Sequence, residues 1–214
     1  MKIIQGFSAE LPTELLKKIG CYRRQIFIDR LSWPLTCHGE IEVDQFDHEN
    51  NYYIIVLGVS GEIHGLGRLL PTTKPYVSEV LLRNSSMNHI LPHNDRIWEM
   101  TRFGSANYQG VNIDSLKIVK FTSLSSLLLF YCLANLHKNG VDRIIATVSP
   151  SIKRLLLRSG FSFTQLHPTF TYNGSQTITG YICHNTISLI HNNESIETKL
   201  KLAIENLHPT LWRK

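Results

Sequence analysis

The chain has 214 residues, a hydrophobic share of 43% and a formal net charge of +5. This length fits one large domain, and the hydrophobic share is ample for a packed core. Charged residues make up 18% of the chain, which is below the usual roughly 25% and excludes a disordered chain. The positive charge is compatible with an acidic protein partner, a nucleic acid or a membrane surface, and does not choose among them.

Cysteine usage and the apolar segments indicate a soluble, cytoplasmic protein. Four cysteines are scattered with no C-x-x-C pair and no zinc-like spacing, at Cys21, Cys37, Cys132 and Cys183, so we expect reduced thiols. Residues 1–10 lack a basic region followed by a long apolar run, so they do not read as a signal peptide. The longest apolar stretch, around Leu127 to Leu133, is too short to span a bilayer.

The first half of the chain predicts a helix, a long loop and several strands. Apolar residues recur at helical spacing from Leu11 to Asp29, whereas Ser32 to His48 shows no periodicity. A loop of that length inside a compact domain is usually functional or disordered. Two apolar runs joined by Ser60-Gly61 predict a hairpin. The expected elements that follow are strands Tyr52–Val59 and Glu62–Leu70, a helix Tyr76–Arg83 and a strand Arg96–Phe103.

The second half predicts helices alternating with strands. Asn139-Gly140 and Ser159-Gly160 supply the expected C-terminal stops of two helices. The expected elements are helix Ile113–Lys138, strand Asp142–Val148, a helix opening at Pro150, strands Phe161–Leu166 and Thr177–Cys183, and helix Ser195–Leu207. With no linker in the chain, this order predicts one α/β domain over residues 1–214, a three-layer αβα sandwich with a mixed central sheet.

Two clusters concentrate charged and aromatic residues. The first runs from Arg23 and Phe27, four apart on one helix face, through Trp33 to Asp44 and Asp47 in the long loop. Carboxylates mixed with aromatic rings suit a cationic ligand that carries an aromatic ring. A helix whose arginines pair with surface acids explains these residues equally well.

The second cluster is Trp98-Glu99-Met100-Thr101-Arg102-Phe103, with Arg68 on the preceding hairpin. Strand alternation predicts that Trp98, Met100 and Arg102 share one face and that Glu99, Thr101 and Phe103 share the other. A buried charge in a sheet is costly unless it is paired. Across both clusters three acids match three arginines, so a purely structural ion network remains a second interpretation.

These residues together resemble the acyl-homoserine lactone synthases of the LuxI type. The matching positions are Arg23, Phe27, Trp33, Asp44, Asp47, Arg68, Glu99 and Arg102, in order and spacing. The segments 67–76 and 154–160 are similar to the family as well. The resemblance implies a fold like that of the Gcn5-related N-acetyltransferases, with a twisted mixed sheet. It also implies that the chain transfers an acyl group from acyl carrier protein to the amine of S-adenosylmethionine, then closes the lactone and releases methylthioadenosine, for quorum sensing.

The resemblance also suggests roles for the matched residues. Glu99 would hold the attacking amine or a water that takes its proton, and a backbone N–H just after Arg102 would stabilise the thioester oxygen. Arg23 and Arg102 would orient the methionine carboxylate or hold the acids in place. Asp44 and Asp47 would keep the long loop closed, and with Arg68 they would complete the catalytic set. Phe27, Trp33 and Phe103 would contact S-adenosylmethionine. We expect the amine to attack the thioester and the carboxylate then to close the ring.

The acyl donor is expected to contact the second half of the chain. The pocket for the acyl chain would be lined by Met100, Phe103, Leu124, Leu128, Ile145, Thr147 and Phe163, although apolar residues at such spacings are more often plain core. In the family, small polar residues at a strand end, here Thr147 and Ser149, can recognise a 3-oxo group. Acyl carrier protein is acidic, and Lys153, Arg154 and Arg158 predict a basic helix face for it. A pyrophosphate loop of the form [RQ]-x-x-G-x-[GA] is not evident, which favours the carrier protein over coenzyme A.

Two other classes of function stay open. A coenzyme A-dependent N-acyltransferase acting on another amine explains the fold and Glu99, but not Asp44 and Asp47 with Arg23. A nucleic-acid-binding module would need a clustered basic face with interleaved aromatic residues, which is not evident. The ten histidines include no H-E-x-x-H motif, so no metal or cofactor is expected, with S-adenosylmethionine as a substrate.

Overall fold

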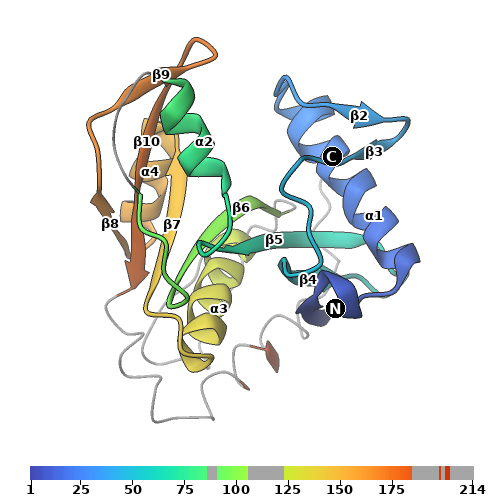
Figure 1. The fold of residues 1–214 in the computed structure, drawn as a ribbon. Helices are drawn as coiled ribbons and strands as arrows, with labels where there is room; N and C mark the ends of the chain where they lie inside the picture. Colours follow the sequence, from blue (N-terminus) through green and yellow to red (C-terminus); the bar gives the residue numbers. More distant parts are fainter. Residues whose placement is uncertain (86–90, 106–122, 185–197, 199–200, 203–214) are drawn as a thin grey trace.

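A computed structural model describes residues 1–85, 91–105, 123–184, 198 and 201–202 (Figure 1). The elements in chain order are β1 (Lys2–Phe7), the 3₁₀-helix η1 (Ser8–Glu10), α1 (Thr13–Arg23), the π-helix η2 (Arg24–Arg30), β2 (Cys37–His38), β3 (Ile41–Glu42), β4 (Tyr52–Leu57), β5 (Ile63–Pro71), α2 (Val77–Asn84), β6 (Ile97–Ser105), α3 (Leu124–Lys138), β7 (Arg143–Val148), α4 (Pro150–Arg158), β8 (Phe161–Gln165), β9 (Phe170–Tyr172) and β10 (Ser175–His184).

One mixed sheet forms the middle layer, with its strands in the order β1-β4-β5-β6-β7-β10-β8 and β9 paired to β10. Only β6 and β7 pair in parallel among these strands, through Ile97↔Arg143, Trp98↔Ile144 and Glu99↔Ile145. Beyond Glu99 and Ile145 these two strands no longer pair, and Figure 1 shows β6 and β7 running apart. The sheet is therefore split at its centre, next to Glu99.

Helices cover both faces of the sheet, which confirms the expected three-layer architecture. On one face α3 and Leu156 of α4 pack into a core with Ile54, Val56 and Ile144. On the other face α1 packs on Tyr53 and Ile55, and α2 packs on Ile145. Alternate residues of β4 thus enter different cores, as the pleat of a strand requires. Gly65 of β5 allows α3 to come close, since a Cβ there would lie 2.9 Å from Leu128.

Local signals explain where the second-half helices begin and end. Ser123 and Ser149 cap α3 and α4 by accepting hydrogen bonds from Ser126 N and Ile152 N. Gly140 and Gly160 follow their ends with φ near +85°, the left-handed conformation that glycine tolerates. The expected start of α3 near Ile113 and most of the expected helix Ser195–Leu207 lie outside the described residues.

Three details of the first half differ from the sequence prediction. The helix expected to continue to Asp29 is α-helical only to Arg23 and goes on as the π-helix η2. The Ser32–His48 segment, expected to be a loop, contains the two-residue strands β2 and β3, which pair with each other. The edge strand β1 was not predicted, because it has few apolar residues and is too short to show a clear alternation of apolar and polar residues.

Candidate active site

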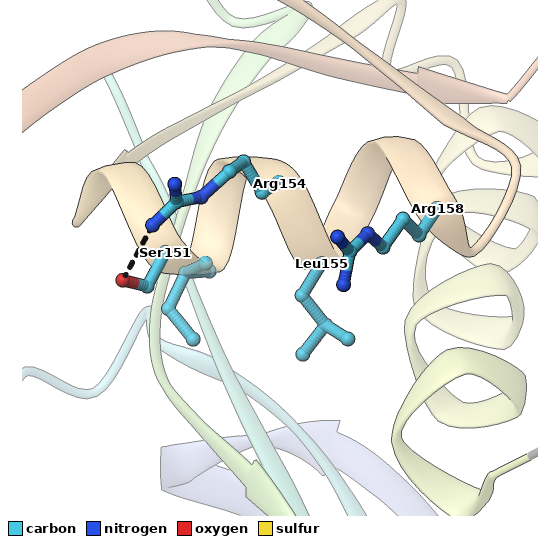
Figure 2. A pocket seen from close by; sticks show the side chains of 5 residues that line it. Ser151, Arg154, Leu155 and Arg158 are labelled. Carbon is cyan, nitrogen blue, oxygen red and sulfur yellow. Dashed lines mark hydrogen bonds between the residues drawn. The ribbon is translucent and has the colours of Figure 1, made fainter.

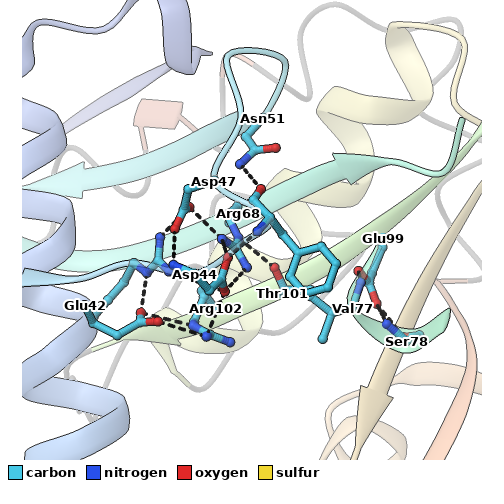
Figure 3. A network of polar contacts seen from close by, with 12 residues as sticks. Glu42, Asp44, Asp47, Asn51, Arg68, Val77, Ser78, Glu99, Thr101 and Arg102 are labelled. Atoms are coloured by element: carbon cyan, nitrogen blue, oxygen red, sulfur yellow. Dashed lines mark hydrogen bonds and ion pairs between the residues drawn. The ribbon is translucent and has the colours of Figure 1, made fainter. Parts of the chain in front are cut away.

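Three arginines and three carboxylates meet on the face of the sheet that α1 covers (Figure 3). Arg68 stands at the centre of this ion network, fully buried in the middle of β5. Its Nη1 donates to Asp44 Oδ1 at 2.8 Å and to Asp47 Oδ1 at 2.6 Å, and its Nη2 donates to Asp44 Oδ2 at 2.8 Å. Its Nε donates to Thr101 Oγ1 at 3.0 Å. All three nitrogens of this guanidinium are therefore hydrogen-bonded.

Glu42 joins the other two arginines of the network. Arg23 Nε donates to Glu42 Oε2 at 2.6 Å, and Arg102 Nη2 donates to Glu42 Oε1 at 2.9 Å. Arg23 Nη1 also donates to Asp47 Oδ1 at 2.7 Å, and Arg102 Nη2 lies 2.8 Å from Asp44 Oδ2. Arg23 Nη2 is buried and lies 3.5 Å from Asp44 Oδ2, an ion-pair distance, but makes no hydrogen bond to a described residue.

Charge pairing, more than burial, sets the protonation of the network. Burial raises the pKa of Asp44, but the hydrogen bonds and charge of Arg68 outweigh it and lower the pKa of this carboxyl. Burial also raises the pKa of Asp47, and there the charge of Arg68 with the hydrogen bond and charge of Arg23 lower it. Burial likewise raises the pKa of Glu42, and hydrogen bonds from Arg102 and Arg23 bring it below its ordinary value. The three acids are ionised at neutral pH, opposite three permanently charged arginines.

Arg102 reaches this network because β6 bulges at that residue. The register between β5 and β6 shifts between Leu66 and Arg68, so that two residues of β6 oppose one residue of β5. Arg102 has a positive φ of 45°, and its side chain lies on the face of Thr101. The predicted alternation is therefore wrong beyond Thr101. Phe103 packs with Met100 against the α3 core, and Arg102 does not share their face.

Two aromatic rings border the ion network. The rings of Phe27 in η2 and Trp33 lie 5.0 Å apart, inclined at 33°. The guanidinium carbon of Arg102 is 5.7 Å from the centre of the Phe27 ring, a cation–π distance. Phe27 is buried whereas Trp33 is 44% exposed. The structure thus brings together the aromatic and charged members of the first sequence cluster and leaves the Trp33 ring open to a ligand.

Glu99 of β6 lies apart from the ion network, next to the first residues of α2. It is fully buried, and its Oε2 accepts a hydrogen bond from Val77 N at 2.8 Å while Oε1 accepts from Ser78 N at 2.6 Å and from the Ser78 hydroxyl. Burial raises the pKa of Glu99 to about 7, although the bonds from Ser78 and Val77 and the charge of Arg68 act to lower it. An acid that titrates near neutral pH is suited to proton transfer.

A chain of hydroxyl groups continues from Glu99 across the sheet. The Ser78 and Thr147 hydroxyls are 2.6 Å apart, and those of Thr147 and Thr179 are 2.7 Å apart. Ser78 and Thr179 are fully buried, whereas Thr147 is partly exposed. We call Glu99, Ser78, Thr147 and Thr179 the hydroxyl chain.

The residues expected to line an acyl pocket divide between the two faces of the sheet. Five of them join or pack against the α3 core: Met100, Phe103, Leu124, Leu128 and Phe163. Ile145 belongs to the α2 core, and Thr147 contacts Ser78 of α2 on the same side. Met100 and Ile145 lie at or next to the last β6–β7 pair, Glu99↔Ile145, but the seven residues do not form one wall.

Helix α4 carries an exposed surface with both basic and apolar residues. A hollow of about 430 Å³ is lined by Ser151, Ile152, Arg154, Leu155 and Arg158 (Figure 2). Leu155 and Ile152 are 56% and 45% exposed. Lys153 points elsewhere, since its Nζ donates to Gln165 at 3.1 Å and lies over the Phe163 ring. Of the three expected docking residues, the structure brings Arg154 and Arg158 together and separates Lys153.

Sequence reasoning missed three polar residues of these sites, Glu42, Ser78 and Thr179. Glu42 could have been found from Ile41-Glu42-Val43-Asp44, where alternation puts both acids on one side. No signal marked Ser78 or Thr179, which contact the rest of the hydroxyl chain only through the fold. Within the described part of the chain, no group of three or more His, Cys, Asp or Glu residues is arranged to hold a metal ion. Nor is any described helix long and apolar enough to cross a bilayer.

Comparison with known proteins identifies the family and the fold. A family model described as autoinducer synthase matches residues 9–184. An acyl-homoserine-lactone synthase of Acinetobacter nosocomialis is 29% identical over 174 residues, covering 81% of this chain and 94% of that protein. The structure of BjaI, a CoA-dependent acyl-homoserine lactone synthase with MTA, superimposes with a TM-score of 0.71 at 22% identity over 89% of this chain and 86% of that chain. An acyl-CoA N-acyltransferase from Pseudomonas aeruginosa gives 0.57 at 14% identity, over 84% and 97%, so the expected acyltransferase fold is confirmed.

Proposed function

Because the chain belongs to the autoinducer synthase family and is an acyltransferase of the acyl-homoserine lactone synthase type, we propose that it acylates S-adenosylmethionine from acyl carrier protein. The α-amine attacks the thioester carbonyl, so that an amide bond forms and the carrier thiol leaves. The methionine carboxylate then attacks the γ-carbon, which closes the lactone as the carbon–sulfur bond breaks and methylthioadenosine departs. The product would serve in quorum sensing.

The observation that best supports an S-adenosylmethionine site is the ion network beside the paired rings of Phe27 and Trp33. Arg23 Nη2, which makes no hydrogen bond to a described residue and is 3.5 Å from Asp44, suits the methionine carboxylate. The exposed Trp33 ring suits the adenine or the sulfonium, because aromatic faces attract cations. Asp44 and Asp47 hold the segment after β3 against β5 and so keep these groups in place.

Glu99 is proposed as the group that receives the amine proton, through a water held beside it. An amine must be deprotonated before it attacks, and a carboxylate with a pKa of about 7 accepts a proton readily at neutral pH. Glu99 also marks the point where β6 and β7 part, which gives an acyl chain a path between the strands. The backbone bulge at Arg102 offers an irregular N–H arrangement nearby for the thioester oxygen.

The acyl donor is proposed to be acyl carrier protein because α4 presents Arg154 and Arg158 around exposed Leu155. A basic rim around an apolar centre suits an acidic protein surface. BjaI is CoA-dependent, so coenzyme A thioesters are the alternative donor. The segment between β6 and α3, where a pyrophosphate loop would lie, falls outside the described residues.

Lactone formation tests the function directly. The gene is expressed in a bacterium that makes no lactone, and the medium is extracted for mass spectrometry. We expect an acyl-homoserine lactone with the intact gene, none with Arg102→Ala, and an undiminished amount with Arg96→Ala, a matched arginine that is exposed and pairs with Asp142. A folded Arg102→Ala protein that makes lactone at the normal level would refute the assigned site.

A further inference from the structure

The two-residue strands β2 and β3 form a hairpin that carries Glu42 into the ion network. Its register pairs Cys37 with Glu42 and His38 with Ile41, and Gly39 at the turn has a positive φ of 62°. Two pairs of residues give a hairpin little stability of its own. The position of the β2–β3 hairpin therefore depends on the surface that supports it, and β3 packs against α1.

Gly20 is the residue at which α1 makes room for the β2–β3 hairpin. A Cβ atom on Gly20 would lie 2.3 Å from Ile41 Cγ2 and 3.4 Å from the carbonyl oxygen of Glu42. One turn further along α1, Arg24 Nη1 donates a hydrogen bond to Gly39 O at 3.1 Å. Glycine is less favourable than alanine inside a helix, and at this position its missing side chain leaves the space that Ile41 fills.

The hydrogen bonds of Glu42 leave little room for a displacement of the hairpin. Arg23 Nε donates to Glu42 Oε2 at 2.6 Å, and Arg102 Nη2 donates to Glu42 Oε1 at 2.9 Å. A methyl group added at 2.3 Å from Ile41 would push it away by about 1 Å, to the usual distance between carbon atoms. Ile41 is β-branched and stiff at χ1, so its backbone has to move. A shift of about 1 Å takes the bonds of Glu42 out of hydrogen-bonding range.

We propose that Gly20 is a positioning residue for the S-adenosylmethionine site, because it sets where Glu42 lies between the two arginines. The inference rests on the proposed function, in which Arg23 and Arg102 orient the carboxylate of the methionine. When the hairpin is displaced from α1, these two arginines lose the carboxylate that bridges them. Their guanidinium groups are then no longer preorganised, and S-adenosylmethionine binds less tightly.

The test compares two ligands, only one of which has the methionine carboxylate. S-adenosylmethionine carries that group, whereas methylthioadenosine lacks it and keeps the adenosine. Isothermal titration calorimetry on the full chain measures both dissociation constants. We expect Gly20→Ala to raise Kd for S-adenosylmethionine by about tenfold and Kd for methylthioadenosine by less than about twofold. General damage to the fold would raise both constants alike.

A second substitution should rescue the first. Ile41→Ala removes the Cγ2 atom that a side chain at Gly20 would meet. The double variant, Gly20→Ala with Ile41→Ala, should therefore bind S-adenosylmethionine within about threefold of Ile41→Ala alone. Gly6→Ala is the matched control, because its Cβ would lie at ordinary contact distances of 3.4 Å from Glu10 Oε2 and 3.6 Å from Leu11 Cδ2. Both dissociation constants should stay unchanged in this control.

The outcomes separate this inference from the proposed function. A folded Gly20→Ala protein with the wild-type affinity for S-adenosylmethionine would overturn the inference, and so would a double variant that binds as weakly as Gly20→Ala. If Gly20→Ala does not fold, a folded double variant with the affinity of Ile41→Ala supports the inference, and a double variant that also does not fold overturns it. The proposed function stands in each case if the wild-type protein makes lactone. A wild-type protein that binds neither ligand and makes no lactone would overturn both.

Discussion

Burial and hydrogen bonding act in opposite directions on Glu99, and burial is the larger effect. Two backbone N–H groups and the Ser78 hydroxyl stabilise its charged form, yet its pKa is raised to about 7. A similar set of donors in water would lower the pKa of a carboxyl group. The hydrogen bonds therefore orient Glu99, and its carboxylate is still basic enough to take a proton near neutral pH.

The rate of acyl transfer should follow the ionisation of Glu99. Because only the carboxylate accepts a proton, we expect kcat to fall as the pH is lowered through about 7. Glu99→Gln should reduce kcat by about a hundredfold or more and remove this acidic limb. The measurement is a pH–rate profile with saturating substrates, with circular dichroism to show that the variant is folded. An unchanged profile in Glu99→Gln would assign the proton transfer to another group.

At the scale of single residues, the sequence singled out charged residues that the structure brings into contact, but not the direction in which each side chain points. Arg23, Asp44, Asp47 and Arg68 were all predicted, and they meet in one ion network. The sheet face on which Arg102 lies was predicted wrongly, because a bulge interrupts the alternation of side chains along β6. The bulge arises from the pairing of β5 with β6. Such pairings between distant strands leave no local pattern in the sequence.

Elements with strong end signals were predicted to within a few residues. Pro150 at the first turn and Gly160 after the end bound α4 as expected. The end of α1 was not predicted, because the apolar spacing continues into η2 and does not distinguish an α-helix from a π-helix. The orientation of Lys153 away from Arg154 is likewise set by β8, which supplies Gln165.

Reversing the charges of α4 should weaken the encounter with acyl carrier protein. We expect Arg154→Glu with Arg158→Glu to raise KM for the acyl carrier protein substrate by about tenfold and to leave KM for S-adenosylmethionine nearly unchanged. Steady-state kinetics at low salt measure both constants, and the difference should shrink at high salt. The control is Lys17→Glu with Arg96→Glu, an equal charge change on exposed side chains away from α4. An equal rise in KM for the control would place docking outside α4.

Over the whole molecule, two sets of acids make opposite contributions to stability as the pH changes. Asp44, Asp47 and Glu42 have lowered pKa values in the folded chain. Below about pH 4.5 these carboxyl groups take up protons in the unfolded chain but stay ionised in the folded chain. Their contribution to stability is therefore lost as the pH falls. Glu99 has a raised pKa, so the folded chain binds the extra proton between about pH 4.5 and 7. Its contribution is therefore present at low pH and is lost as the pH rises through 7.

The free energy of unfolding should accordingly be greatest near pH 5, and two variants should separate its two slopes. Glu99→Gln should flatten the decline between pH 5 and 7, because the amide does not titrate. Asp47→Asn should cost about 3 kcal/mol at neutral pH, since Arg23 and Arg68 lose a charged partner in a buried network, and should reduce the loss below pH 4.5. Urea titrations at several pH values measure these slopes. If each variant altered the pH range assigned to the other, the opposed contributions of the ion network and Glu99 would be disproved.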